Sequence, residues 1–419
     1  MSFETISVIG LGYIGLPTAA MFAAHGKNVI GVDVNQEAVD TINDGKIHIV
    51  EPGLDAIVFK AVSTKKLKAS LTPLPADAFL IAVPTPFMGN EHQPDLRYIE
   101  AAAKTIAPVL KKGNLVILES TSPVGTTEKM ADWLSEIRPD LSFPRTKGVL
   151  SDIRIAHCPE RVLPGQVVRE LVENDRVIGG LTEKCSEMAI QLYKIFVRGD
   201  CIVTNARTAE MAKLTENASR DVSIAFANEL SIICDELDIN VWELIRLANR
   251  HPRVNILNPG PGVGGHCIAV DPWFIVSETP QQSKLIHTAR IVNDGKPGWV
   301  LDKVKRGIYE HLASNPHKAM ADITIACFGV AFKADIDDVR ESPALHIALS
   351  LSKQEFKKLL VVEPNVLELP DGFSDKSELV STETALLDAD VLVILVGHKE
   401  FQGLVIAKDK IVIDTIGLT

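Results

Sequence analysis

A cysteine stands inside a glycine-rich loop in the second half of the chain. The loop reads Gly262-Val-Gly264-Gly265-His266-Cys267 and is followed by Asp271. Glycines carry no side chains to shield the sulfur, so a substrate can approach it, and a cysteine thiolate is a strong nucleophile. We therefore take Cys267 as a candidate nucleophile, whereas His266 fits a loop hydrogen bond as well as it fits catalysis. Four other cysteines lie on apolar segments and read as small buried side chains: Cys185, Cys201, Cys234 and Cys327.

A second group of polar residues lies on one predicted helix. Lys213, Asn217 and Arg220 are four and seven positions apart, so they share one helix face. An ordinary solvated face explains this stripe equally well. The helix is otherwise mostly apolar, however, and a partly covered lysine can act as an acid, a base or an oxyanion stabiliser.

A glycine pattern near the start of the chain is typical of dinucleotide binding. Gly10-Leu-Gly12-Tyr-Ile-Gly15 follows a predicted strand and opens a predicted helix, and Asp33 ends the next strand. The first glycine allows a tight turn, the second allows close approach of a pyrophosphate, and the third allows helix packing. Asp33 can accept hydrogen bonds from a ribose diol and repels a 2′-phosphate, which favours NAD over NADP. A merely structural turn is the alternative.

The elements around these residues predict an α/β protein. The uncharged run from Ile6 to Ala24 lacks the positive n-region of a signal peptide, and its glycines and proline make it a poor membrane span. Continuous apolar strands alternate with helical segments, which indicates a parallel, doubly wound sheet covered on both faces. From about Thr208 to Glu236 the pattern predicts one long helix without glycine or proline.

A second α/β series begins after residue 314. We therefore expect two doubly wound Rossmann-like domains joined by a long central helix and a helical middle region. The predicted boundaries are 1–205 for an NAD-binding domain, 206–314 for the central region with the Cys267 loop and a dimer surface, and 315–419 for the second α/β domain.

Composition narrows the class of partner. The 419 residues include 43 Lys and Arg against 54 Asp and Glu, a formal charge of −11, and we find no basic block that would bind a nucleic acid. The six cysteines are scattered, without a CxxC pair or a tight His/Cys cluster, so we expect neither a metal site nor a disulfide scaffold. A reducing cytoplasm fits this cysteine usage best.

Seven motifs together resemble the UDP-glucose/GDP-mannose 6-dehydrogenase family along the whole chain. They are GLGYIGLP at 10–17, VPTP at 83–86, ESTSPVGTTEK at 119–129, CPERVLPG at 158–165, EMAKLTEN at 210–217, GVGGHCIAVDP at 262–272 and FKADIDDVRESP at 332–343. The resemblance implies oxidation of a sugar C6 hydroxyl to a carboxylate with two NAD⁺ per sugar and no release of the aldehyde. It also implies a UDP-binding C-terminal domain and a homodimer built through the long helix.

The resemblance assigns roles to individual positions. Cys267 would capture the aldehyde as a thiohemiacetal that is oxidised to a thioester. Lys213 would handle a proton or stabilise an oxyanion with help from Asn217, and Asp271 and Glu160 would serve water activation and thioester hydrolysis. NAD would contact Gly10, Gly12, Tyr13, Ile14, Gly15, Asp33, Thr85, Thr126 and Arg340. The nucleotide-sugar site would be lined by Arg161, Val162, Lys213, Asn217, Arg220, His251, Arg253, Gly264, Phe332 and Lys333.

One departure from the family pattern bears on the substrate. The UDP-glucose branch commonly has a lysine where this chain has Val270, which favours an N-acetylated hexosamine, and we expect UDP-N-acetyl-D-mannosamine. UDP-glucose or UDP-N-acetylglucosamine remains the alternative within the family. A two-electron dehydrogenase of the β-hydroxyacid type and a catalytically silent nucleotide-binding module are the alternatives outside it.

Overall fold

The computed structural model describes residues 3–89, 92–163, 165–265 and 267–419. The chain folds into two compact units, Met1–Glu216 and Asn217–Thr419, each with hydrophobic cores of its own. The three-part division made from the sequence stays a prediction. Within the described residues, no helix is both long and apolar enough to cross a bilayer.

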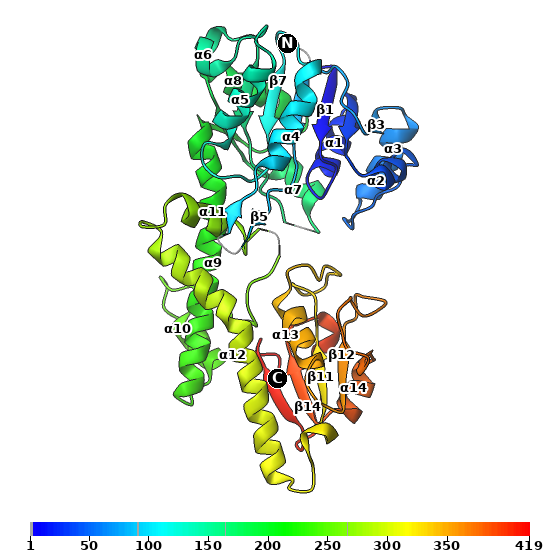
Figure 1. Ribbon diagram of the computed structural model, residues 1–419, viewed down its shortest axis with the longest axis vertical. Coiled ribbons are helices and arrows are strands. Elements are labelled where there is room, and N and C mark those ends of the chain that lie inside the picture. Colours follow the sequence, from blue (N-terminus) through cyan, green and yellow to red (C-terminus); the bar gives the residue numbers. More distant parts are fainter. Residues whose placement is uncertain (1–2, 90–91, 164, 266) are drawn as a thin grey trace. The chain divides into compact units, whose positions relative to one another are not determined.

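The first unit is built on an eight-stranded sheet in the order β10-β9-β8-β7-β4-β1-β2-β3. Strands β7, β1 and β3 of this sheet are labelled in Figure 1. Its strands are β1 Thr5–Ile9, β2 Asn28–Val32, β3 Leu67–Ser70, β4 Ala78–Ile81, β7 Leu115–Leu118, β8 Arg154–His157, β9 Arg176–Gly180 and β10 Cys201–Asn205. A small hairpin, β5 Phe87–Met88 with β6 Gln93–Pro94, stands apart from it. All neighbouring strands of the large sheet are parallel except β8 and β9, which are antiparallel. The apolar pattern of β9 predicts burial on both faces but carries no information on strand direction, so this exception could not be foreseen.

Helices cover both faces of this sheet. They are α1 Gly15–Ala24, α2 Gln36–Asn43, α3 Leu54–Ser63, α4 Arg97–Ile106, η1 Ala107–Val109, α5 Thr126–Ile137, α6 Pro144–Lys147, η2 Gly148–Leu150, α7 Val167–Glu173 and α8 Glu183–Tyr193. Alternate residues of a strand enter opposite cores: Val8 packs with one hydrophobic cluster and Ile9 with the other. This two-sided burial explains why the strands are continuously apolar, and it confirms the doubly wound class.

Long helices dominate the middle of the chain. Helix α9 spans Ala206–Glu236, close to the predicted helix, and is followed by α10 Val241–Ala248, α11 Asp271–Glu278 and α12 Lys284–Ser314. Within the second unit, α9 and α12 are joined by buried polar contacts, because Arg290 donates to Asp221 at 2.6 Å and Asn293 donates to the same carboxylate at 2.8 Å. The pair of helices forms a rigid support for the loop between α10 and α11, since Asn228 of α9 accepts the backbone N–H of Gly260 at 2.9 Å.

The second unit ends in a five-stranded, fully parallel sheet with the order β13-β12-β11-β14-β15. Its strands are β11 Thr324–Phe328, β12 Lys358–Val362, β13 Ser377–Leu379, β14 Val391–Ile394 and β15 Ile411–Asp414. Its helical elements are η3 Met320–Asp322, α13 Pro343–Ser352, α14 Thr382–Asp388 and η4 Lys399–Phe401. Here too the strands feed two cores, with Cys327 in one cluster and Phe328 in the other. The predicted second Rossmann-like domain is thus confirmed.

Candidate functional site

In the glycine turn between β1 and α1, some glycines are required by the fold and another leaves room for a ligand. Gly10 has φ +89°, and a Cβ there would clash with the Ala82 carbonyl; a Cβ at Gly15 would clash with the Gly10 carbonyl. Gly12 is exposed, and a Cβ there would meet no heavy atom of the described residues within 4 Å, apart from its chain neighbours. The protein itself therefore requires Gly10 and Gly15, whereas the open space at Gly12 suits a closely approaching pyrophosphate.

Asp33 and the start of α1 complete a cradle for a dinucleotide. Asp33 is half-buried and accepts the Leu11 N–H at 2.8 Å, which fixes its carboxylate beside the glycine turn. Helix α1 has no side-chain cap at Ile14 among the described residues and no acidic residue in its first turn. Its N-terminal N–H groups and dipole favour an anion. The turn lies where β1 is flanked by β2 and β4, the switch point at which doubly wound sheets bind nucleotides. The residues present therefore fit NAD.

The remaining predicted NAD residues are placed differently. Tyr13 and Ile14 lie in the glycine turn and are half-buried. Thr85 follows β4 and its hydroxyl donates to the Thr121 carbonyl. Arg340 belongs to the second unit, where it makes a bidentate ion pair with Asp338. Its contact with NAD stays a prediction.

Thr126 is fully buried, and its hydroxyl donates to the Pro123 carbonyl at 2.7 Å. Its side chain is engaged at the start of α5, and its contact with NAD stays a prediction. Glu210 of α9 caps the same helix, accepting the N–H groups of Gly125 at 2.6 Å and Thr127 at 2.8 Å. Two motifs far apart in the sequence are thereby joined inside the first unit.

Three of the predicted catalytic residues gather in the second unit at the start of α11. Asp271 is its first residue and is buried, and its N–H donates to the Cys267 carbonyl at 2.8 Å. The Asn217 amide donates to the Asp271 carboxylate at 2.5 Å. All six cysteines lie in the described part of the chain, and Cys267 alone among them is exposed. An accessible sulfur therefore stands one turn away from an oriented carboxylate.

The structure gives a different reason for the glycines before Cys267 than the one predicted from the sequence. A Cβ at Gly264 would clash with the Glu341 carbonyl and lie 2.7 Å from Pro343, and a Cβ at Gly265 would lie 3.1 Å from the Phe332 ring. These glycines let the loop pack directly on the segment that carries Phe332, rather than merely clearing a path to the thiol. His266 lies outside the described residues.

Glu160 is held by an arginine that sequence reasoning did not identify. Its carboxylate forms a buried ion pair with Arg176 at 2.6 Å and accepts the Arg161 N–H at 2.8 Å. The Arg161 side chain in turn pairs with Glu216 at 2.7 Å, while Val162 packs on the hydrophobic cluster beside α7. Both oxygens of Glu160 are engaged, so its carboxylate has a fixed orientation. These contacts suit an orienting residue better than a base that must accept a proton.

A buried polar group surrounds this ion pair. The Arg176 guanidinium lies over the Tyr193 ring at 4.9 Å, and the Tyr193 hydroxyl donates to Glu119 at 2.7 Å. Burial, together with the charge of Glu160, raises the pKa of Glu119 to about 7, and burial raises the pKa of the Cys158 thiol to about 12. Cys158 is therefore a protonated, inert thiol. Arg176 lies outside the quoted motifs, and Glu119, the first residue of the motif at 119–129, was given no role there.

The predicted substrate residues are spread over both units. Lys213 and Asn217 are half-buried on α9, while Arg220 on the same helix is exposed. His251 and Arg253 lie in the exposed segment after α10, where the Arg253 N–H points to the His251 ring at 3.4 Å. The roles of Lys213, Arg220, His251 and Arg253 in substrate binding stay predictions.

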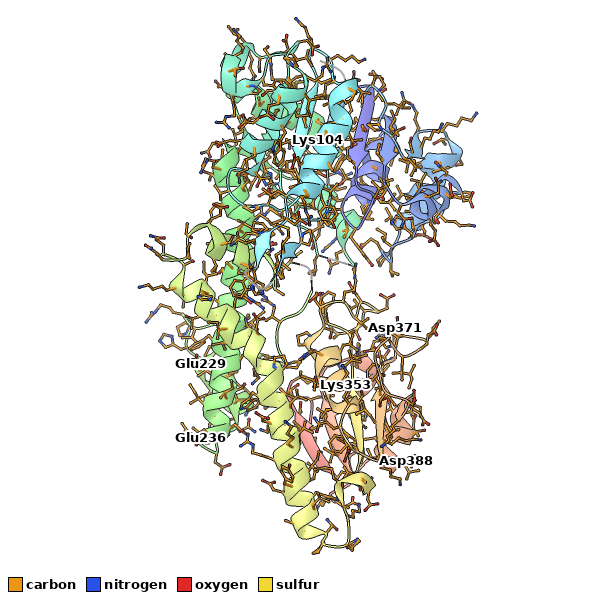
Figure 2. All side chains as sticks on the ribbon, viewed as in Figure 1. Lys104, Glu229, Glu236, Lys353, Asp371 and Asp388 are labelled. Carbon is orange, nitrogen blue, oxygen red and sulfur yellow. The ribbon has the colours of Figure 1, made fainter. Side chains whose placement is uncertain are left out.

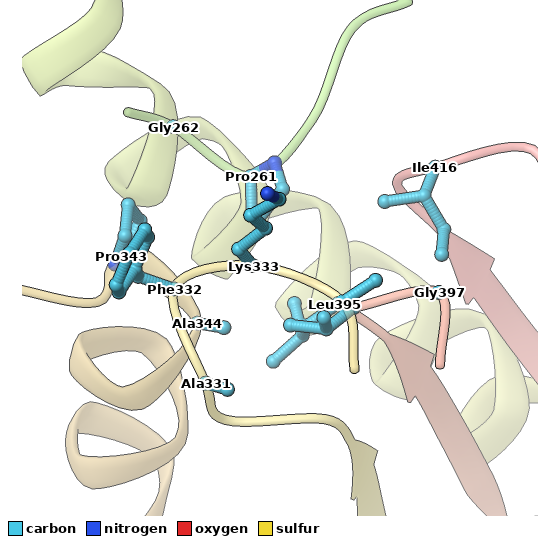
Figure 3. Close-up of a pocket in the computed structure, with 12 residues that line it drawn as sticks. Pro261, Gly262, Ala331, Phe332, Lys333, Pro343, Ala344, Leu395, Gly397 and Ile416 are labelled. Carbon is cyan, nitrogen blue, oxygen red and sulfur yellow. The ribbon is translucent and has the colours of Figure 1, made fainter. Parts of the chain in front are cut away.

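Phe332 and Lys333 line a cavity of about 200 Å³ in the second unit (Figure 3). The cavity lies at the carboxyl ends of β11 and β14, beneath the Pro261–Gly262 segment, and Lys333 extends toward Pro261. Gly262 and Pro343 belong to the motifs at 262–272 and 332–343 but were given no role, and four further lining residues were not predicted: Pro261, Leu395, Gly397 and Ile416. Their position at the switch point of the second sheet is the signal that would have found them, since nucleotides bind there in doubly wound folds.

A possible metal cluster also arises in this unit. Asp335, His398 and Glu400 lie close enough together to share an ion. Both ring nitrogens of His398 are engaged, however, one with the Asp335 N–H at 3.0 Å and one with Glu363 at 3.0 Å. This group therefore lacks the imidazole ligand it would need.

Comparisons with known proteins agree with this geometry. Three domain models of the UDP-glucose/GDP-mannose dehydrogenase family match the chain: the NAD-binding domain over residues 4–197, the central domain over 207–295 and the UDP-binding domain over 326–419. A UDP-N-acetyl-D-mannosamine dehydrogenase from Yersinia pestis is 67% identical over 404 residues, 96% of each chain. An NDP-N-acetyl-D-galactosaminuronic acid dehydrogenase from Ralstonia nicotianae (strain ATCC BAA-1114 / GMI1000) is 62% identical, covering 100% of this chain and 97% of that one.

A solved structure supports the same relationship. The UDP-D-ManNAc dehydrogenase from Pyrococcus horikoshii aligns with a TM-score of 0.85 and 39% identity, covering 99% of this chain and 96% of the other. The matches extend over the glycine turn, the Cys267 loop and the Lys333 cavity, and an NAD-binding and a UDP-binding domain are both present. The resemblance found from the motifs is confirmed: this chain belongs to the UDP-glucose/GDP-mannose dehydrogenase family.

Proposed function

We propose that the protein oxidises the C6 hydroxyl of UDP-N-acetyl-D-mannosamine to the carboxylate, giving UDP-N-acetyl-D-mannosaminuronate with reduction of two NAD⁺. The observation that carries the proposal is the exposed thiol of Cys267, joined through its backbone to the buried Asp271, in a chain with NAD-binding and UDP-binding domains. A two-electron dehydrogenase has no use for such a nucleophile. The 67% identical relative and Val270 both favour the N-acetylmannosamine substrate.

The residues divide the reaction between them. NAD at the Gly10–Gly15 turn would supply the hydride acceptor for each of the two oxidations. Lys213 takes up the hydroxyl proton or stabilises the oxyanion. The Cys267 thiolate adds to the aldehyde to form a thiohemiacetal, whose oxidation gives a thioester. Water then cleaves the carbon–sulfur bond, releasing the carboxylate and restoring the thiol. Asn217, hydrogen-bonded to Asp271, orients the carboxylate that activates this water.

The stoichiometry of NADH tests the proposal. We expect two NADH per UDP-N-acetyl-D-mannosamine consumed, measured by absorbance alongside chromatography of the sugar nucleotide. Cys267→Ser should stop the second oxidation, so that at most one NADH forms per sugar. One NADH per sugar from the unaltered enzyme, with free aldehyde accumulating, would favour the two-electron reaction instead.

A second substrate belongs in the same assay. The 62% identical relative is named for an N-acetyl-D-galactosaminuronic acid product, so UDP-N-acetyl-D-galactosamine is a candidate. A panel of UDP-sugars, including UDP-glucose and UDP-N-acetylglucosamine, would rank them by kcat/KM. The preferred sugar is the one with the highest value, and UDP-N-acetyl-D-mannosamine is the expected one.

We further propose that the protein is a cytoplasmic homodimer paired through α9. Six cysteines without a disulfide suit a reducing compartment. Phe226 and Ile233 are exposed on one face of α9, seven residues apart, and the exposed Leu237 directly follows the last residue of the helix. Such an apolar stripe is stabilised when a second chain covers it.

A further inference from the structure

The first and last sheets of the chain repeat one local geometry. In the first, Ile9 pairs with Val32 of β2 and with Ile81 of β4. In the last, Phe328 pairs with Val362 of β12 and with Ile394 of β14. Counting onward from these pairs, Gly329 corresponds to Gly10. Both glycines have positive φ, +85° and +89°, and both donate to the strand alongside, at 2.8 Å to Val362 and to Val32.

The same register places Glu363 where the first sheet has Asp33. Asp33 accepts the N–H of Leu11 at 2.8 Å, and Glu363 accepts the N–H of Val330 at 2.8 Å. Each carboxylate therefore fixes the turn that follows the first strand of its sheet. They differ in exposure, because Asp33 is half-buried whereas Glu363 is 4% exposed. Asp33 keeps an open side for a ribose, and Glu363 does not.

A histidine takes the open side of Glu363. His398 stands four residues after β14, and Thr85 holds the corresponding place after β4. The His398 Nδ1 accepts the Asp335 N–H at 3.0 Å, so its proton lies on Nε2, which donates to Glu363 at 3.0 Å. Burial alone would raise the pKa of Glu363, but the hydrogen bonds from His398 and the Val330 N–H outweigh it and lower that pKa. The pair is thus an ionised carboxylate with a buried imidazole donor.

These contacts fix the segment that carries Lys333. Glu363 holds its beginning through the N–H groups of Val330 and Ala331, and His398 holds its end through the N–H of Asp335. Asp335 has φ +62°, in the left-handed region that aspartate adopts more readily than most residues other than glycine. Lys333, between these two anchors, lines the cavity at the switch point of the sheet.

We propose that His398 and Glu363 are positioning residues for the nucleotide of the sugar substrate. His398 gives Glu363 the hydrogen bond that a bound ribose would give Asp33 in the first sheet. Together the two residues hold Lys333 in place to bind a diphosphate. This inference depends on the proposed function in one respect, which is that the diphosphate belongs to UDP. Since the carboxylate of Glu363 is already satisfied, this sheet does not offer NAD the acidic partner that the first sheet offers. The two similar domains thereby take different nucleotides.

Titration calorimetry of UDP binding to the full chain tests the proposal. His398→Ala should weaken UDP binding about tenfold and raise KM for the UDP-sugar equally. It should leave KM for NAD⁺, and kcat at saturating substrate, within twofold of the unaltered enzyme. His398→Gln keeps a donor toward Glu363 and should recover most of the affinity, and added imidazole should partly restore His398→Ala. Ser352→Ala is the control, because it deletes a buried hydroxyl of α13 that donates to the Leu349 carbonyl of its own helix.

The outcomes separate this proposal from the proposed function. Unchanged UDP affinity in His398→Ala overturns the positioning role, even if the enzyme oxidises UDP-N-acetyl-D-mannosamine. A general loss, in which kcat, both KM values and thermal stability change together and neither Gln nor imidazole restores them, also overturns it. UDP binding that depends on His398 in a protein that oxidises no UDP-sugar supports the inference while the proposed reaction fails.

Discussion

Asp271 and Glu160 are both candidates for hydrolysis of a thioester, but their surroundings differ. Glu160 is paired with Arg176 at 2.6 Å and also accepts a backbone N–H, so its lone pairs are largely committed. Asp271 is oriented by Asn217 and lies one turn after Cys267, with its own N–H bonded to the Cys267 carbonyl. A base must lie close to the bond that breaks. We therefore assign water activation to Asp271 and an orienting role to Glu160.

Asp271→Asn should trap the acyl-enzyme. The amide keeps the volume and the contact with Asn217 but cannot take a proton from water, so the thioester on Cys267 should accumulate. Intact-protein mass spectrometry after mixing with NAD⁺ and UDP-sugar would reveal the added mass. Glu160→Gln is the matched control and should turn over without this accumulation. Trapping by Glu160→Gln and not by Asp271→Asn would reverse the assignment.

At the scale of elements, substitutions in the turn from β1 to α1 should affect stability and NAD⁺ binding separately. Gly12→Ala adds a methyl group into space that the described protein atoms leave open. It should raise KM for NAD⁺ about tenfold or more, with little change in the free energy of unfolding. Gly10→Ala puts a side chain at φ +89° against the Ala82 carbonyl, and should cost roughly 1–3 kcal/mol of stability.

Urea denaturation and NAD⁺ kinetics on the two variants provide the measurement. Equal destabilisation by both substitutions would show that Gly12 also serves the fold. An unchanged KM for NAD⁺ in Gly12→Ala would remove the pyrophosphate from this turn.

The same turn shows how far a sequence can predict structure. Glycine spacing and the acid at Asp33 predicted this cradle because each residue acts within a local strand–turn–helix unit. The antiparallel run of β9 and the pairing of Glu160 with Arg176 could not be predicted, since both depend on which distant segments become neighbours. Likewise, the glycines near Cys267 were predicted to leave the thiol accessible, but their close packing on Phe332 and Glu341 is visible only in the fold.

At the scale of the whole molecule, the exposed apolar stripe at the end of α9 is the surface on which we expect a second chain to bind. Phe226, Ile233 and Leu237 are 53%, 44% and 61% exposed. Phe226 and Ile233 fall within about 20° of one another around α9, and Leu237 directly follows the end of the helix. Glu229 and Glu236, labelled on α9 in Figure 2, run along one side of this stripe. An apolar centre with a charged rim is the usual anatomy of a protein interface. A second copy of the chain, with its own α9, offers a self-complementary surface of this kind.

The double substitution Phe226→Glu and Ile233→Glu should dissociate the dimer. It places like charges opposite each other across an isologous interface, whereas an exposed glutamate costs a single chain little. Light scattering after gel filtration should fall from twice the chain mass to the chain mass of 45.6 kDa. Leu387→Glu is the control, because Leu387 is 78% exposed on α14 and should leave the mass unchanged. A dimeric double variant would move the interface off this stripe, and a monomeric unaltered enzyme would overturn the proposed homodimer.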